Sequence, residues 1–78
     1  MPTVLRAEGF RFFFFSNERE EPPHVHVEKG GGTAKVWLED VSLAYSHDLS
    51  SAECRRIREL TFAHRNAFLE RWHEHFGR

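Results

Sequence analysis

The chain has 78 residues, one cysteine and nearly balanced charge, with 11 Lys or Arg and 12 Asp or Glu. This length is near the lower limit for one hydrophobic core, so we predict a single domain over residues 1–78. The composition excludes a disulfide-stapled scaffold, a membrane span and the strong basic excess of most nucleic-acid-binding domains, and we expect a cytoplasmic protein.

Two strands and a loop are predicted in the first part of the chain. Residues 3–6 form a short extended run, and Gly9 favours a turn after it. Residues 10–15 contain five phenylalanines around Arg11, a run too continuous for a sheet with one solvated face. This run predicts a central strand that is buried on both sides. The acidic, double-proline segment 16–23 predicts an ordered loop.

A hairpin is predicted next, because residues 24–28 and 34–38 both alternate with period two around a glycine-rich turn. On the first strand Val25 and Val27 would point to one face, and His24, His26 and Glu28 to the other. The hairpin would therefore have one apolar and one polar face.

A long C-terminal helix is predicted to begin at Ser50, where Ser50 and Glu53 match the capping-box pattern, and to end at Gly77. Apolar residues recur at three- and four-residue steps between these points, which predicts one stripe facing the sheet. The predicted fold is therefore α+β, with a small antiparallel sheet of about four strands packed on one long C-terminal α-helix.

The pair His24 and His26 is the strongest candidate for chemistry. Two histidines at i and i+2 on a strand share a face, and histidine titrates near neutral pH without assistance. They could serve as catalytic base and acid in phosphodiester cleavage, which also needs a cation near the phosphate. Candidate substrate-binding residues are Arg6, Arg11 and Lys35 for phosphate and Trp37 for stacking on a base.

Two other interpretations of the same histidines remain open. No metal or other cofactor is required, but His24, His26 and Glu28 could together hold a divalent ion such as zinc. Alternatively, the histidines are structural residues that pack against Trp37 and form local hydrogen bonds. The arginines at positions 55, 56 and 58 are most simply a solvated helix face, and the alternative is that they contact RNA or an acidic partner.

The order of several motifs resembles one bacterial family. Gly9-Phe10-Arg11-Phe12-Phe13-Phe14, Glu21-Pro22-Pro23-His24-Val25-His26-Val27 and Ala34-Lys35-Val36-Trp37-Leu38, with a helical Arg56-Ile57-Arg58-Glu59-Leu60, are similar to the proteins grouped as "domain of unknown function 4160". The resemblance spans nearly the whole chain.

This resemblance implies a toxin–antitoxin pair, in which a protein of this type is the toxin and a small "domain of unknown function 2442" protein is its antitoxin partner. It supplies no list of catalytic residues. We therefore expect a type II toxin that acts on RNA through the histidine face. The alternatives are a non-enzymatic protein-interaction module and a small metal-binding protein. An open sheet edge would also allow a homodimer.

Overall fold

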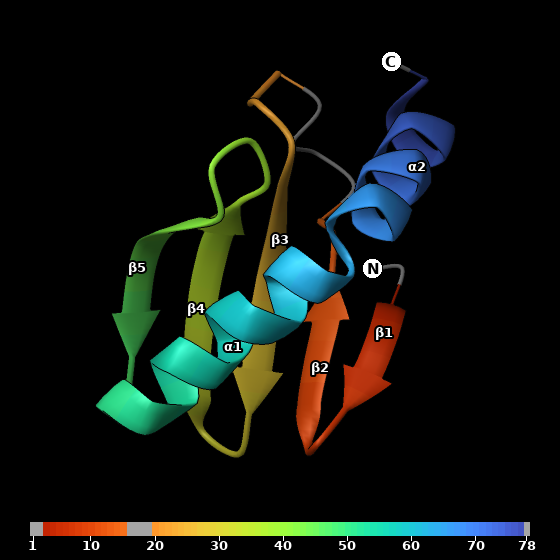
Figure 1. The fold of residues 1–78 in the computed structure, drawn as a ribbon. Coiled ribbons are helices and arrows are strands. Elements are labelled where there is room, and N and C mark those ends of the chain that lie inside the picture. Colours follow the sequence, from red (N-terminus) through yellow and green to blue (C-terminus); the bar gives the residue numbers. More distant parts are fainter. Residues whose placement is uncertain (1–2, 16–19, 78) are drawn as a thin grey trace.

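The computed structural model describes residues 3–15 and 20–77. This part of the chain is α+β, with an antiparallel sheet in the order β1-β2-β3-β4-β5 and two helices (Figure 1). The elements are β1 (Thr3–Ala7), β2 (Phe10–Phe13), β3 (His24–Lys29), β4 (Gly32–Trp37), β5 (Ser42–His47), α1 (Ser51–Ala63) and α2 (Arg65–Phe76). Each strand pairs with its neighbours in the sequence, so the sheet is a meander.

The two predicted hairpin turns are present. Glu8 and Gly9 connect β1 and β2 with φ of 56° and 85°, as a two-residue hairpin turn of the favoured hand requires. Lys29 is paired with Gly32, so Gly30 and Gly31 form the second turn. The prediction of a hairpin from residues 24–28 and 34–38 is confirmed. Four residues of the predicted loop, 16–19, lie outside the described residues.

The prediction of about four strands was wrong by one, because β5 was not recognised. A bulge explains why its pattern is obscure. Val36 is paired with Leu43 and Lys35 with Tyr45, so Ala44 is an extra residue between them. Leu43 and Tyr45 therefore point to opposite faces, although residues two apart on a regular strand share one.

The phenylalanine run is not the central strand, which is a second correction. Its strand, β2, is second in the sheet, and β3 lies in the middle. Both of its faces are nevertheless buried in the way that the run predicts. Phe12 is fully buried on the face toward the helices, and Phe13 is 5% exposed on the opposite face.

The C-terminal segment forms two helices rather than one long helix. The capping box at Ser50 and Glu53 is confirmed, and Gly77 ends α2 with a φ of 72°. The helices meet at His64, whose φ of −108° and ψ of 14° are not helical. The buried residues Leu60, Phe68, Trp72 and Phe76 are separated by multiples of four residues. On a straight helix this spacing would turn the stripe around the helix axis by roughly 160° from the first of them to the last. A bend is needed to point both ends of the stripe at the sheet.

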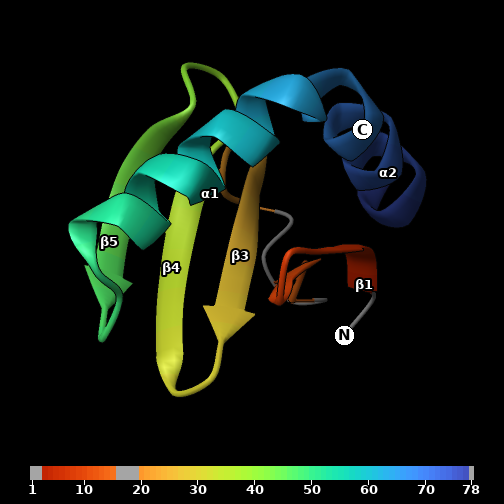
Figure 2. The same cartoon turned by 60° about the horizontal axis from the view of Figure 1, so that its bottom comes forward.

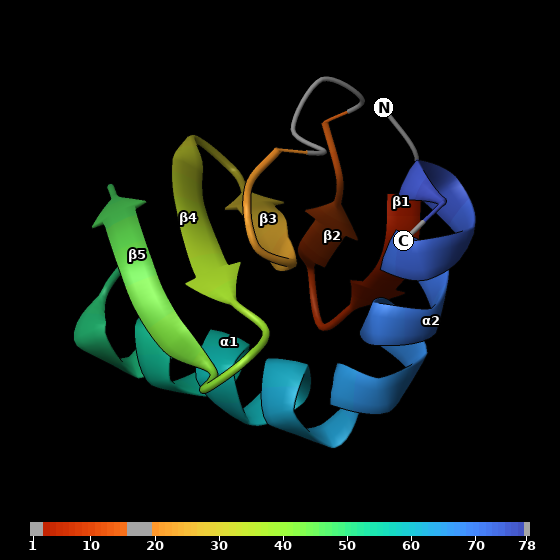
Figure 3. The same cartoon turned by 90° about the horizontal axis from the view of Figure 1, so that it is seen from above.

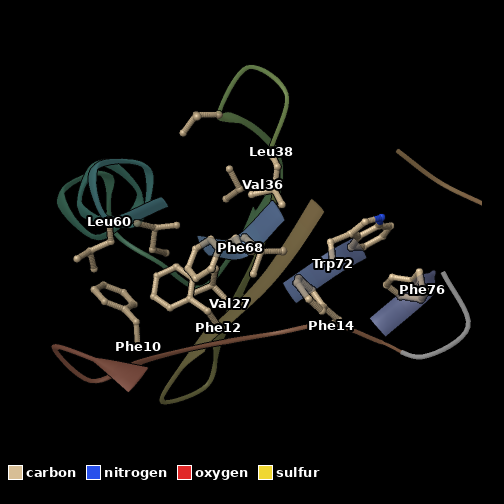
Figure 4. Packing of buried hydrophobic residues seen from close by; sticks show 14 residues of the cluster. Phe10, Phe12, Phe14, Val27, Val36, Leu38, Leu60, Phe68, Trp72 and Phe76 are labelled. Atoms are coloured by element: carbon tan, nitrogen blue, oxygen red, sulfur yellow. The ribbon is translucent and has the colours of Figure 1, made fainter. Parts of the chain in front are cut away.

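Both helices cover the same face of the sheet (Figures 2 and 3). Figure 3 shows α1 crossing β4 and β5, while α2 lies beside β1 and β2. Between helices and sheet lies one apolar cluster, which includes Phe12, Val27, Val36, Phe68 and Trp72 (Figure 4). Within the part of the chain described, neither helix is long and apolar enough to cross a membrane.

Candidate functional site

The face of the sheet opposite the helices, called here the open face, carries the candidate site. Strand register places Phe13, His26, Lys35 and Tyr45 next to one another in a row across β2, β3, β4 and β5. The strand register assigns to the open face the candidates Arg6, Arg11, His26, Glu28, Lys35 and Trp37. His24 shares this register at the start of β3, but its ring also contacts Trp72 of α2. The predicted alternation of β3 is therefore correct, with Val25 and Val27 in the core.

His24 lies at the start of β3 and is fully buried. Its ring centroid is 5.5 Å from that of Trp37 and 5.0 Å from that of Trp72 on α2. Its Nδ1 lies 2.9 Å from the carbonyl oxygen of Pro22. A carbonyl can only accept, so Nδ1 carries the hydrogen and donates. The environment of His24 is that of a packed structural residue.

His26 is 5% exposed and lies among aromatic rings. Its ring stacks on Phe13 at 5.6 Å and meets Phe15 edge-on at 4.5 Å. The Tyr45 hydroxyl lies 3.5 Å from Nδ1 of His26, a long hydrogen-bond distance, and Tyr45 is 41% exposed. Tyr45 is therefore the solvent-facing member of a pair whose other member is buried.

The two central cations of the open face are paired with carboxylates. Arg11 donates from Nη1 to Glu28 at 2.8 Å, and its guanidinium lies 4.4 Å from the Phe13 ring centroid. Lys35 donates to Glu21 at 2.5 Å and lies 4.5 Å from the Trp37 ring centroid. Each cation thus contacts an aromatic ring and a carboxylate at once, an arrangement that fixes its position.

The third candidate cation, Arg6, is exposed and is the cross-strand neighbour of Arg11. It lies one strand further from His26 than Arg11 does. The structure therefore brings together His24, His26, Lys35 and Trp37. Arg11 lies next to this group, separated from His26 by the ring of Phe13, and Arg6 lies at its border.

The metal interpretation finds no supporting geometry. Glu28 binds Arg11 and does not join the histidines. Among residues 3–15 and 20–77 there is no group of three or more His, Cys, Asp or Glu side chains that could hold a metal ion.

Tyr45 and Glu21 are the site residues that sequence reasoning missed. The bulge at Ala44 interrupts the alternation of the strand that carries Tyr45, and Glu21 lies in the segment 16–23, which was predicted only as a loop. One signal for this strand was available in the sequence. The run Ser42-Leu43-Ala44-Tyr45-Ser46-His47 has the length of a strand and lies between Asp40 and Asp48, residues of a type that favours turns.

The arginines of α1 make specific contacts. Arg56 binds Glu8 in the first hairpin turn through two hydrogen bonds, and it also binds Glu59 at 3.2 Å. The hydrogen bond from Arg56 lowers the pKa of the Glu8 carboxyl, and the same pair raises the pKa of Arg56. Arg56 therefore joins α1 to the β1–β2 turn, in addition to lying on a solvated face.

Comparison with known proteins identifies the family of the chain. No match is found among curated proteins or among solved structures. The family model described as "Domain of unknown function (DUF4160)" matches residues 9–73, which is most of the chain and includes β2 to β5, α1 and much of α2. The chain therefore belongs to the DUF4160 family.

Proposed function

We propose that this protein is the toxin of a bacterial type II toxin–antitoxin pair, and that in the cytoplasm it binds and cleaves RNA on the open face of its sheet. The observation that supports the proposal is the row formed by His26, Lys35 and Tyr45. In this row a hydroxyl and an imidazole that could exchange a proton lie beside a cation, on the face that the helices leave uncovered.

The chemistry would be metal-independent transfer of the phosphodiester. The ribose 2′-oxygen attacks phosphorus, the bond from phosphorus to the 5′-oxygen breaks, the 2′-hydroxyl proton goes to a base, and an acid protonates the leaving 5′-oxygen. In our assignment the Tyr45 hydroxyl contacts the substrate, takes the 2′-hydroxyl proton as it passes its own proton to His26 behind it, and then delivers a proton returned by His26 to the leaving 5′-oxygen. Lys35 neutralises the negative charge that develops on the phosphate. His24, fully buried, positions the ring of His26.

Binding of the RNA chain would use the neighbouring residues. Trp37 and Tyr45 offer aromatic surfaces, and stacking of a base on such a ring contributes about 1–3 kcal/mol. Arg11 and Arg6 continue the cationic surface toward β1. The phosphates would compete with Glu21 and Glu28 for Lys35 and Arg11, because each of these cations is paired with a carboxylate in the free protein.

The burial of both histidines favours a second candidate function, a non-enzymatic interaction module. At 0% and 5% exposure, His24 and His26 would then only support the sheet. The exposed residues Tyr45 and Arg6 would contact a protein partner, of which the antitoxin is the first candidate. The two functions differ in what the Tyr45 hydroxyl does, because only the enzyme needs its proton.

The test is inducible expression in a bacterial host of the wild type, Tyr45→Phe and the control Arg71→Gln, which changes an exposed residue on α2. Growth and RNA integrity are measured in cells, and binding and cleavage of a labelled RNA oligonucleotide with purified protein. We expect arrest and cleavage with wild type and Arg71→Gln, and RNA binding without cleavage with Tyr45→Phe. Arrest by Tyr45→Phe as well would indicate the interaction module. If the wild type neither arrests growth nor binds RNA, the proposal fails.

A further inference from the structure

A second surface lies on the helix side of the sheet, away from the open face. It is a cavity of about 600 Å³ that is lined by residues of α1 and of the turn that connects β4 and β5. Figure 1 shows these two segments. We call it the arginine groove, after three of the residues that line it. The groove is lined by two apolar residues, three arginines and three carboxylates: Val41, Phe62, Arg55, Arg58, Arg65, Glu39, Asp40 and Glu59. A cavity of this size accommodates a small ligand or a few side chains of a partner.

Phe62 is the most exposed large hydrophobic residue of the part of the chain described, at 73%. The inward side of α1 is formed by Ile57, Leu60 and Thr61, so Phe62 has no place in the core. A single exposed phenylalanine needs no explanation by itself. Here, however, Phe62 lines the same cavity as Val41, and a partner side chain placed there would cover both.

The arginines beside Phe62 are held by neutral partners. Arg58 donates from Nε to the carbonyl oxygen of Val41 at 3.2 Å. Arg65 donates from Nε to the carbonyl oxygen of Leu38 at 2.6 Å and from Nη2 to that of Glu39 at 3.2 Å. These bonds orient the guanidinium groups, and each guanidinium retains N–H groups that fit a carboxylate. Arg58 precedes Phe62 by one helical turn of α1, and Arg65 at the start of α2 lines the same cavity.

The three acidic residues of the lining indicate which kind of ligand fits. Asp40 accepts hydrogen bonds from the backbone N–H and hydroxyl of Ser42, which lower the pKa of its carboxyl, and Glu39 lies next to it. These carboxylates would repel a nucleic acid, which carries a phosphate on every nucleotide. A peptide is different, because its backbone N–H groups can donate hydrogen bonds to these carboxylates while one of its acidic side chains accepts from the arginines.

We infer that the arginine groove binds a short segment of a partner protein in which an acidic side chain lies next to an aromatic or branched apolar one. The apolar side chain packs on Phe62 and Val41, and the carboxylate accepts from Arg58 and Arg65. This inference does not depend on RNA cleavage at the open face, because the two surfaces share no residue.

The test begins with selection of random peptides on the intact wild-type protein by display. We expect the enriched sequences to place Asp or Glu beside an aromatic or branched apolar residue. A labelled selected peptide is then titrated against the wild type, Phe62→Ser and Arg58→Gln, with Arg71→Gln as the control for loss of an exposed arginine. The first two changes should weaken binding by at least about tenfold, as at an interface hot spot, and the control should not.

Two further measurements keep the outcome clear. Phe62 is exposed, so Phe62→Ser should unfold at the same denaturant concentration as the wild type, which separates lost binding from lost folding. A labelled single-stranded oligouridine is titrated in parallel, as the probe for the alternative ligand, a nucleic acid. The inference is overturned if no peptide is enriched, if the enriched peptides lack an acidic residue, if Phe62→Ser binds them as well as the wild type, or if Arg58→Gln abolishes oligouridine binding.

Discussion

Replacement of His24 by alanine and by leucine separates the packing role of this residue from any chemical role. The alanine variant empties a fully buried site between Trp37 and Trp72, for which we expect a loss of about 2–4 kcal/mol in the free energy of unfolding. A chain of 78 residues has a total of only about 4–12 kcal/mol. The leucine variant fills the site and loses mainly the hydrogen bond to Pro22, so it should lose about 1 kcal/mol.

The assay is urea unfolding followed by tryptophan fluorescence. The two tryptophans of the sequence both contact the His24 ring, so the signal reports on this site. An alanine variant that loses less than about 1 kcal/mol would refute the packing argument, and so would a leucine variant that loses as much as alanine. If the estimate holds, loss of activity in a His24→Ala/His26→Ala double variant would report on folding, and Tyr45→Phe is the better probe of chemistry.

Two further predictions concern the glycine turn and the first hairpin. Gly32→Ala should lower the free energy of unfolding by about 1–3 kcal/mol, because a Cβ there would lie 2.5 Å from both the carbonyl oxygen of Asp48 and Cδ2 of Leu49. Gly31→Ala, which meets nothing within 4 Å, is the control and should melt within a few degrees of the wild type. The Glu8 pKa is lowered in the folded state, so its contribution to stability is present above its unfolded value of about 4.3 and is lost as the pH falls through the folded value. Glu8→Gln should therefore flatten the decline of stability with acid in denaturant titrations, and an unchanged slope would contradict the ion pair with Arg56.

The sequence was most informative where local pattern and tertiary environment agree. On β3 the alternation of valine and histidine assigned both faces correctly, because a strand in the middle of the sheet has regular partners on both sides. Ser50 and Glu53 were sufficient to place the start of the helix, because a capping box involves only four consecutive residues. The grouping of His24, His26, Lys35 and Trp37 on one face follows from the same alternation.

The errors arise where distant contacts decide the local structure. The break at His64 depends on how the apolar stripe must meet the sheet, and Arg65 is held there by carbonyl groups at the end of β4. The face of Tyr45 depends on a bulge that only pairing with β4 reveals. The burial of the histidines could not be predicted either, since it requires rings contributed by Phe13, Phe15 and Trp72 from other parts of the chain.

The meander order of the strands has a consequence for how the chain reaches its fold. Every strand pair joins neighbours in the sequence, so each hairpin closes only a short loop and can form early. The contacts of largest sequence separation are those of the helices, such as Arg56 with Glu8, 48 residues apart, and α2 beside β1. Docking of α2 is thus the step that brings it back to β1 and β2. Because α2 is synthesised after all five strands, the apolar surface that it covers on the sheet stays exposed until it docks.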